Sequence, residues 1–267
     1  MGRRSRSEHI GGLRYFRRGR LFGKLCLCAI AASSVVGLVG AAPASAAETR
    51  YVVSANLSQQ FPGIVFYTGR PSAKNVALTF DDGPDAKYTP QVLDILRRYH
   101  VKATFFVLGV RAKRYPQTVR RMVREGHAIG NHTWNHPDLA KMSASEIRDQ
   151  IVRTDCVLSP LIGYRTNLLR PPYGALNPDT VRVVSAMGYK VVDWSVDTRD
   201  WAGTPVPAML AMVRKDVRPG AIILEHCGGK ADVNLDNTLQ ALPKIIEYLR
   251  SQGYRLVTIP ELIGTSR

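Results

Sequence analysis

Two adjacent carboxylates that follow a short apolar run are the first candidates for chemistry. Asp81 and Asp82 come shortly after residues 76–78, in the sequence Thr-Phe-Asp-Asp-Gly-Pro that ends at Pro84. The run is typical of a buried strand, and α/β proteins place their catalytic groups at the carboxyl ends of strands. Because neighbouring carboxylates repel each other, the pair needs a nearby cation or a raised pKa. Asp-Asp-Gly-Pro is also a good turn sequence, so residues elsewhere in the chain must decide its role.

Two imidazoles four residues apart are the second candidates. His132 and His136 lie in His-Thr-Trp-Asn-His-Pro, and Pro137 disfavours a helix at His136, which predicts a loop or a helix start for the pair. Two histidines and one carboxylate form a common ligand set of catalytic metals, which leaves positions open for water and substrate. Two structural histidines bonded to the backbone are the alternative. With Asp82 available, metal binding is the preferred interpretation.

Three further motifs place charged groups at the ends of expected strands. Arg170 begins Arg-Pro-Pro-Tyr-Gly, and its permanent charge could pair with Asp81 and keep that carboxylate ionised. Asp200 lies in Asp-Thr-Arg-Asp-Trp, and His226 ends Leu-Glu-His. An Asp near a His indicates an oriented imidazole that can hold or release a proton. By itself the Arg motif could equally be a surface turn, and the Asp or the His alone is more often structural than catalytic.

From residue 75 onward, strand patterns alternate with helix patterns. The expected strands are 76–78, 103–108, 127–129, 167–169, 190–195, 221–224 and 254–259. The expected helices are one with Thr89 as its N-cap and Pro90 at its first position, and those at 116–124, 143–158, 177–188, 207–217 and 239–250. About seven strands alternating with helices predict an α/β fold with a parallel sheet or barrel. Periodicity alone does not distinguish a closed barrel from an open sheet.

The first 46 residues have the pattern of a secretory signal peptide. Basic side chains precede an apolar segment at 25–39, and Ala44-Ser45-Ala46 is a small-residue cleavage signature. We therefore divide the chain into a signal peptide at 1–46, a lead-in segment at 47–74 and a catalytic domain at 75–267. A retained membrane anchor is the alternative, but the apolar segment is short.

Export sets the expected surroundings of the protein. The product is expected to be secreted, extracellular or associated with the cell wall, without stable insertion in a membrane, and Arg17-Arg18 leaves the Sec and twin-arginine routes both open. A short edge strand is expected at 51–53. Only Cys156 and Cys227 remain after cleavage, and we expect no bridge between them, because they fall at opposite ends of the expected strands and helices.

Charge restricts the partners. The whole chain carries +16, and the leader holds eight basic residues and one acidic residue, so the remainder carries +9. A basic exported protein suits an anionic surface such as a cell-wall polymer. Nucleic acid is not an expected partner, because Lys and Arg are spread along the chain and the chain is exported. We expect a monomer.

Taken in order, the five motifs resemble those of the NodB-type polysaccharide deacetylases, carbohydrate esterase family 4. The resemblance covers about Asn75 to Ile259. It implies a distorted (β/α)7 barrel, the NodB homology domain, that hydrolyses acetyl groups from N-acetylated sugars. One position departs from the pattern, since the family often has Asp where this chain has Cys227. That change could alter substrate fit or offer a thiol near the metal.

The resemblance also implies roles for individual residues. The ligands of a divalent metal would be Asp82, His132 and His136, with zinc as the expected ion and cobalt or another transition ion as the alternative. The catalytic groups would be Asp81 as general base, tuned by Arg170, and His226 as general acid, oriented by Asp200. The backbone N–H of Tyr173 would stabilise the oxyanion, and the acetyl pocket would be walled by Trp201 and Leu224.

Three functions fit these residues. The preferred one is a secreted metal-dependent deacetylase of N-acetylglucosamine units in peptidoglycan or chitin-type oligosaccharides, which releases acetate. The second is an acetyl xylan esterase, because the same groups serve O-acetyl esters. The third is a carbohydrate-binding protein that lacks turnover, and the presence of the base, the ligands and the acid argues against it.

Overall fold

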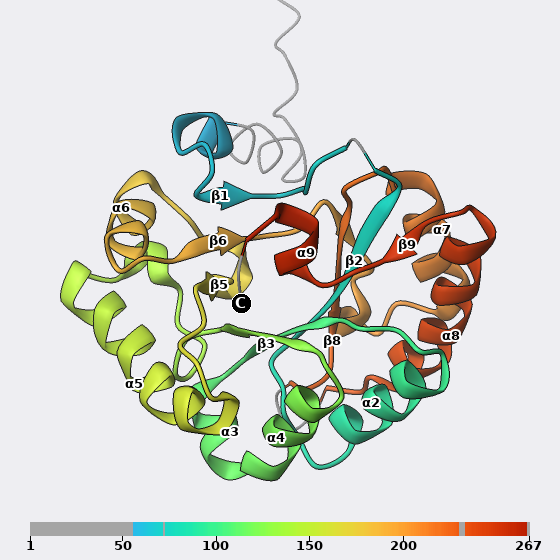
Figure 1. The fold of residues 1–267 in the computed structure, drawn as a ribbon, viewed down its shortest axis with the longest axis horizontal. Helices are drawn as coiled ribbons and strands as arrows, with labels where there is room; N and C mark the ends of the chain where they lie inside the picture. Colours follow the sequence, from blue (N-terminus) through green and yellow to red (C-terminus); the bar gives the residue numbers. More distant parts are fainter. Residues whose placement is uncertain (1–55, 72, 230–232, 266–267) are drawn as a thin grey trace, which may run out of the picture. The chain divides into compact units, whose positions relative to one another are not determined.

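The structure is a computed structural model that describes residues 56–71, 73–229 and 233–265. The expected signal peptide and the expected strand at 51–53 lie outside the described residues. In the described part, a curled sheet is surrounded by helices (Figure 1).

Nine strands of the described residues form one sheet, and every neighbouring pair is parallel. They are β1 (Val65–Phe66), β2 (Asn75–Asp81), β3 (Thr104–Val107), β4 (Ala128–Asn131), β5 (Leu168–Leu169), β6 (Lys190–Val192), β7 (Val196–Asp197), β8 (Ile222–His226) and β9 (Arg255–Leu256). Their order is β1-β6-β5-β4-β3-β2-β8-β7, with β9 beside the first residues of β2. The predicted parallel arrangement is confirmed.

Helices follow the strands and cover the outside of the sheet (Figure 1). They are α2 (Tyr88–Arg98), α3 (Gly109–Arg114), α4 (Pro116–Arg124), α5 (Ala144–Ile162), α6 (Pro178–Ala186), α7 (Val206–Asp216) and α8 (Asp236–Ser251). A further helix, α9 (Ile259–Ile263), lies inside the curl of the sheet. In a parallel sheet each connection crosses back to the end at which the strands begin. The carboxyl ends of all strands therefore lie on the same side. That side receives every motif singled out in the sequence.

The segment after β1 bridges the two halves of the curled sheet. β1 pairs with β6. Four residues further on from Val65, Gly69 donates its N–H to the carbonyl oxygen of Gly220 at 2.8 Å, and Thr68 forms an antiparallel bridge with Ala221 beside β8. The sheet therefore curls into a distorted barrel rather than remaining open, and part of the lead-in segment belongs to the barrel wall.

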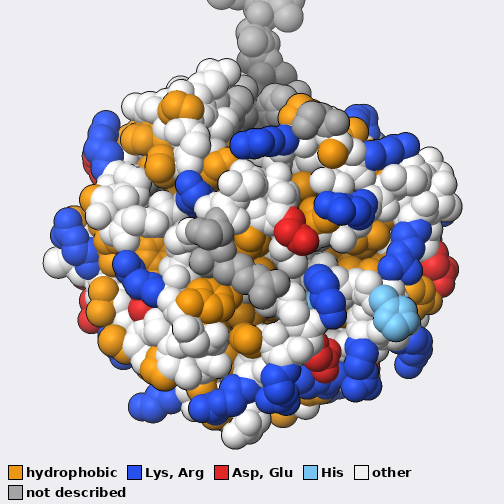
Figure 2. Space-filling view, in the orientation of Figure 1, with side chains coloured by type: hydrophobic (Ala, Val, Ile, Leu, Met, Phe, Trp, Pro, Cys, Tyr) orange, Lys and Arg blue, Asp and Glu red, His pale blue; other side chains and the backbone are white. Residues whose placement is uncertain are grey.

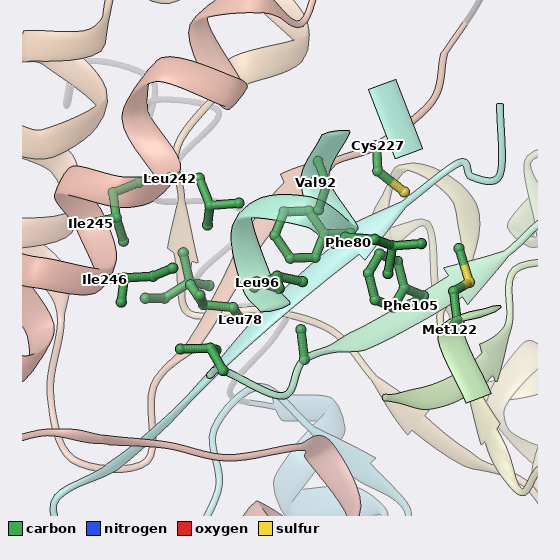
Figure 3. Close-up of a cluster of buried hydrophobic side chains, with 14 of the residues drawn as sticks. Leu78, Phe80, Val92, Leu96, Phe105, Met122, Cys227, Leu242, Ile245 and Ile246 are labelled. Atoms are coloured by element: carbon green, nitrogen blue, oxygen red, sulfur yellow. The ribbon is translucent and has the colours of Figure 1, made fainter. Parts of the chain in front are cut away.

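Two apolar layers stabilise the barrel. In the outer layer, Phe80 stacks on Phe105 with ring centroids 5.3 Å apart, and α8 packs Leu242 and Ile246 nearby (Figure 3). In the inner layer, residues of α9 pack against the first residues of the strands, with Ile259 in the same buried cluster as interior side chains of β2 and β8. Each fully buried side chain of this size contributes about 1.5–3 kcal/mol. The amino ends of the strands are thus filled, and the carboxyl ends hold the polar groups.

The first helix begins differently from the prediction. α2 starts at Tyr88, and Asp85 Oδ1 accepts the N–H groups of Lys87, Tyr88 and Thr89 at 3.1, 2.7 and 2.9 Å. The prediction of Thr89 as the N-cap is wrong, because a carboxylate four residues earlier takes these donors. The Thr89 hydroxyl instead donates to the carbonyl oxygen of Cys227 at 2.7 Å.

The remaining helix starts follow the sequence. The capping box of Ser143 and Glu146 opens α5, and Asn177 caps α6 through the N–H of Thr180. α3 and α9 were not predicted, because six and five residues are too few to show a helical repeat.

The surface seen in Figure 2 carries Lys and Arg side chains over its whole extent and few acidic ones. Among the helices of the described residues, none is both long and apolar enough to cross a bilayer. Both described cysteines are free, Cys156 at the surface and Cys227 in the core, which confirms the expectation that they are not bridged.

Glu225 is an ionisable residue inside the outer apolar layer. It lies on β8 opposite Phe80 of β2, and its side chain is fully buried. Neither carboxyl oxygen has a hydrogen-bond partner within the described residues. Burial, and then the nearby Asp200 carboxylate, raise the pKa of Glu225 well above its ordinary value. Glu225 is therefore uncharged in the folded protein where an unfolded chain would ionise it.

Replacing Glu225 by Gln should stabilise the protein at neutral and alkaline pH. In the wild type, stability is fully present below the ordinary pKa of Glu and is lost as pH rises toward the raised folded pKa, because only the unfolded chain then releases the proton. The loss is about 1.4 kcal/mol per pH unit within that window. Denaturant unfolding at about pH 4 and about pH 8 measures this loss of stability. The free energy of unfolding of E225Q should exceed that of the wild type only at the higher pH. Glu247→Gln, an exposed change on α8, is the control. An equal effect of E225Q at both pH values would show that the ionisation of Glu225 is not the cause of the stability change.

Candidate active site

A cavity of about 660 Å³ opens at the carboxyl ends of the strands. The sequence-predicted residues that line it are Asp81, Asp82, His132, His136, Tyr173, Trp201, Leu224 and His226. Arg170 and Asp200 lie behind this lining, bonded to Asp81 and to His226. The structure therefore brings all the predicted site residues together.

Left-handed backbone conformations concentrate around this cavity. Six non-glycine residues of the described part have a positive φ, and all except His100 belong to the site motifs. The five are Asp82 at 67°, Thr133 at 70°, His136 at 67°, Tyr173 at 62° and Arg199 at 52°. This conformation is unfavourable for a residue with a Cβ, and it persists where the surrounding structure enforces it, commonly at functional sites.

Asp82, His132 and His136 form a compact group of three potential metal ligands, with ligand atoms within 4.8 Å of one another. Asp82 Oδ1 lies 3.4 Å from His132 Nε2 and 3.3 Å from His136 Nε2, yet this buried oxygen receives no hydrogen bond from the described residues. His132 Nδ1 donates to the carbonyl oxygen of Arg170 at 2.7 Å, which leaves the Nε2 lone pair toward Asp82. A buried carboxylate oxygen without a donor, between two imidazole nitrogens, fits a divalent metal ion.

The charge states of these three residues also suit a metal. Burial opposes the ionisation of Asp82, but the adjacent His132 and the charges of His136 and His226 hold the pKa of its carboxyl well below the ordinary value. Burial and the neighbouring His132 lower the pKa of His136 to about 4, so that imidazole is neutral at pH 7. The pKa of His132 is raised, because the charges of Asp81 and Asp82 outweigh its burial. A raised pKa favours a proton on His132, and a bound metal ion would displace that proton.

Arg170 is fully buried and fixes Asp81. Its Nη1 donates to Asp81 Oδ1 and to the hydroxyl of Thr79, each at 2.8 Å. Its Nε and Nη2 donate to the carbonyl oxygens of Val192 and Asp193 at 3.0 and 2.9 Å. The predicted pair is confirmed, and with Oδ1 occupied, Oδ2 of Asp81 is the oxygen available to a substrate or water. Thr79 was missed by the sequence analysis, although it shares the face of Asp81 by strand alternation.

Asp200 orients His226. Asp200 Oδ1 accepts from Nδ1 of His226 at 2.8 Å, and Oδ2 accepts the backbone N–H of His226 at 2.7 Å and the hydroxyl of Thr238 at 2.9 Å. Burial disfavours the charged imidazole, but Asp200 outweighs it and raises the pKa of His226 to about 9. His226 is therefore protonated near pH 7. Nothing in the local sequence identifies Thr238, which reaches the site from α8.

The remaining predicted residues form the rim and floor of the cavity. The Tyr173 ring packs edge-on against His136 at a centroid distance of 4.5 Å, and its side chain is 63% exposed. Within the described residues, the backbone N–H of Tyr173 has no hydrogen-bond acceptor. Trp201 is 51% exposed, whereas Leu224 is buried below it in the lining. Exposed aromatic rings beside a polar cavity suit stacking on a sugar.

The two histidines lie on a loop, one of the two placements that the sequence predicted, and side chains of α5 hold that loop. Asn131 Oδ1 accepts the Thr133 N–H at 2.8 Å, and Asn131 Nδ2 donates to Asp155 at 3.0 Å. Gln150 Oε1 accepts the Trp134 N–H at 2.9 Å. The sequence analysis named none of these supports. Asn131 directly precedes the first site histidine, which is a local signal, but Gln150 and Asp155 are distant in sequence.

Cys227 does not present a thiol to the cavity. Its side chain is fully buried in the outer apolar layer with Phe80 and Val92 (Figure 3). His226 faces the cavity, and successive side chains of a strand point to opposite faces. Burial raises the pKa of the Cys227 thiol well above its ordinary value, so it stays protonated. The suggestion of a thiol beside the metal is wrong for this reason.

The arrangement is suited to hydrolysis of an acyl group. A divalent metal ion held by the three ligands would act as a Lewis acid on the acyl carbonyl and lower the pKa of a water molecule. Asp81 and His226 are register partners on β2 and β8, which places a proton acceptor beside a proton donor. Asp81 can take the proton of an attacking water at Oδ2, and His226 can give its proton to a leaving nitrogen. The free N–H of Tyr173 can stabilise the developing oxyanion.

Comparison with known sequences identifies relatives of the chain. A family model described as polysaccharide deacetylase matches residues 68–192. A peptidoglycan-N-acetylglucosamine deacetylase of Bacillus cereus is 42% identical over 203 residues, which cover 75% of this chain and 72% of the relative. A chitooligosaccharide deacetylase of Sinorhizobium fredii is 39% identical over 204 residues, 73% of this chain and 93% of the relative. The chain spans only 39% of the length of peptidoglycan-N-acetylglucosamine deacetylase PgdA of Listeria monocytogenes, at 42% identity over 72% of this chain.

Solved structures share the fold. The Bc1960 peptidoglycan N-acetylglucosamine deacetylase superposes with a TM-score of 0.73 at 41% identity, over 76% of this chain and 94% of that one. BA3943 of Bacillus anthracis, a CE4 family pseudoenzyme, superposes with a TM-score of 0.70 at 30% identity, over 76% of this chain and 70% of that one.

The barrel, the polar cavity at its carboxyl end and the Asp-His-His group define a hydrolase of the α/β-barrel class. The chain belongs to the polysaccharide deacetylase family, the NodB-type deacetylases of carbohydrate esterase family 4. Relatives in this family are named as deacetylases of peptidoglycan and of chitooligosaccharides, which are hydrolases of carbon–nitrogen bonds other than peptide bonds. The fold and family predicted from the sequence are confirmed.

The roles of base and ligand can be separated by mutation. Asp81→Asn should lower turnover by roughly 10²- to 10⁴-fold, the usual contribution of a general base, while an added divalent metal ion still binds. His132→Ala should lose both metal binding and turnover, because it removes a candidate ligand. Metal content and acetate release measured on the same preparations test this. His100→Ala, which removes an exposed histidine outside the cavity, should change neither. Full activity of Asp81→Asn would exclude Asp81 as the base.

Proposed function

We propose that this protein is a secreted, metal-dependent deacetylase that hydrolyses the acetamide of N-acetylglucosamine units in peptidoglycan or chitin-type oligosaccharides and releases acetate. Zinc is the proposed ion, held by Asp82, His132 and His136. The named activities of the relatives support these two substrate classes. The proposal extends to a monomer that acts outside the cell or at the cell wall.

The observation that carries the proposal is the bond of Asp200 to His226, which raises the pKa of that imidazole, beside the Asp81 carboxylate that Arg170 fixes. An amide nitrogen is a poor leaving group unless it receives a proton. In the reaction, water oxygen adds to the acetyl carbon, Asp81 takes one water proton, the C–N bond breaks and His226 protonates the nitrogen. The products are acetate and a free amine on the sugar. An ester would need this acid less, so the pair favours the amide.

Secretion is supported by the leader pattern and by the charge. Residues 1–46 have the composition of a signal peptide, and they lie outside the described residues. The +9 charge of the remainder, counted above, suits an anionic wall polymer.

Acetate release from three substrates tests the function. The protein is stripped with a chelator, reloaded with zinc, and incubated with chitin oligomers, peptidoglycan and acetylated xylan. Zinc-restored release from either of the first two supports the deacetylase. Release from xylan alone would make the protein an acetyl xylan esterase, and no release from any substrate would indicate a carbohydrate-binding protein.

The pH profile should report on His226. Activity on the acetamide should fall as pH rises through about 9, because His226 then loses the proton that it must donate. Asp200→Asn should move this alkaline limb to lower pH by about one unit or more, because the imidazolium loses its counter-charge. The measurement is kcat/KM against pH for a chitin oligomer.

An activated acetyl ester is the control substrate, because its leaving group needs no proton. His226→Ala should lower hydrolysis of the acetamide far more than hydrolysis of the ester, by roughly 10²-fold or more in relative terms. Equal losses on both substrates would remove His226 from the acid role.

A further inference from the structure

One cationic side chain lines the cavity without any role in the chemistry described above. Arg111, on α3, is part of the lining together with Asp82, Gly228 and Gly229. A Cβ on Gly228 would lie 2.6 Å from the Asp82 carbonyl oxygen and 2.9 Å from Arg111 Nη1. The guanidinium of Arg111 therefore lies on the same side of the cavity as the candidate metal ligand Asp82. Only a glycine at position 228 leaves room for the backbone to pass so close to both residues.

Arg111 is anchored by a hydrogen bond and is not neutralised by any carboxylate of the described residues. Its Nη2 donates to the carbonyl oxygen of Gly229, which fixes the guanidinium at the edge of the cavity. Within the described residues it forms no ion pair with a carboxylate. Arg170 and Arg121, in contrast, are paired with acidic side chains. A guanidinium has five N–H donors in a planar fork, so Arg111 keeps donors and a full charge for a ligand.

A neutral sugar gives no reason for this arrangement. Hydroxyl and acetamide groups carry no charge, so neutral donors and aromatic faces are sufficient to bind them, and the rim supplies aromatic faces through Tyr173 and Trp201, both more than half exposed. A guanidinium is the side chain that matches a carboxylate, through two parallel hydrogen bonds. Chitin oligomers carry no carboxylate, whereas every second sugar of a peptidoglycan strand is a muramic acid. Its lactyl group ends in a carboxylate or in an acidic peptide.

We propose that Arg111 is a specificity-determining residue that binds a carboxylate of a muramic acid-containing glycan and so favours peptidoglycan strands over neutral chitin oligomers. The inference rests on the proposed function and names its substrate. Arg111 contacts a neighbouring sugar or its substituent, and the acetyl group under attack lies at Asp81, Asp82 and His226.

The test compares matched tetrasaccharides with the zinc-loaded protein. The neutral one is N-acetylchitotetraose, and the charged ones alternate N-acetylglucosamine with N-acetylmuramic acid, with the peptides either removed or retained. Arg111→Gln should lower kcat/KM for a charged substrate, relative to the neutral one, by roughly tenfold or more, mainly through KM, as expected for a lost charge-assisted hydrogen bond. A fall seen only without the peptides assigns the lactyl carboxylate, and a fall seen only with them assigns the peptide.

Arg114→Gln is the matched control. Arg114 lies on the same helix, is exposed and is not part of the cavity lining. Its substitution therefore removes the same charge without removing a side chain that lines the cavity. The ratio of charged to neutral substrate should not change in this variant. An unchanged ratio in Arg111→Gln, an equal loss on all substrates, or the same shift in both variants would overturn the proposal. The second result would mean that Arg111 only ties α3 to Gly229.

Binding separates this inference from the proposed function. Dissociation constants for the same tetrasaccharides, measured in the Asp81→Asn background with and without Arg111→Gln, do not depend on turnover. If Arg111→Gln abolishes the preference for the charged tetrasaccharide in this background, recognition of the carboxylate by Arg111 is supported, whether or not the wild type releases acetate. A wild type that releases no acetate would overturn only the proposed deacetylase function. Equal affinities for charged and neutral tetrasaccharides with Arg111 present would overturn the Arg111 proposal alone.

Discussion

The buried Arg170–Asp81 ion pair is the interaction on which the site depends. A guanidinium removed from water is costly unless its donors are matched, and here four hydrogen bonds run to acceptors on β2, on β6 and in the segment after β6. Its carbon Cζ also lies 4.2 Å from the Phe106 ring centroid, which adds a cation–π contact from β3. The carbonyl oxygen of the same residue orients His132. Through its side chain and its backbone carbonyl, one residue therefore links neighbouring strands of the barrel to the base and to a proposed metal ligand.

The site separates its charges by environment. Arg170 keeps Asp81 paired on one side, while Asp200 holds His226 protonated on the other. The two acting residues are neighbours across β2 and β8, so an ordinary parallel pairing sets their spacing. A pair of titratable groups whose environments favour opposite protonation states is the pattern expected of a base and an acid working at one pH. Among the left-handed residues around the site, Thr133 is held by Asn131, which donates to Asp155 of α5, and Arg199 donates its N–H to Asp197.

The sequence was sufficient to predict the alternating strands, the family and the groups at the strand ends, because each depends on local patterns. The closure of the barrel by residues after β1 depends on a contact with Gly220, about 150 residues away, which no local pattern encodes. The start of α2 was misplaced because Asp85 accepts the N–H groups of Tyr88 and Thr89, so the helix begins before Thr89. Thr238 and Gln150 reach the site only through tertiary packing, and the unpaired charge of Arg111 cannot be seen until its neighbours are known.

Strand alternation explains where variation can occur in this family. On β8, Leu224 and His226 face the cavity, whereas Glu225 and Cys227 belong to the layer under the helices, where changes act on stability. The pseudoenzyme relative shows that this fold persists without turnover, so the fold alone does not establish activity. Relatives named for peptidoglycan and for chitooligosaccharides are about equally similar to this chain. Discrimination between such substrates must therefore come from side chains on loops and short helices around a common set of catalytic groups, as Arg111 does from α3.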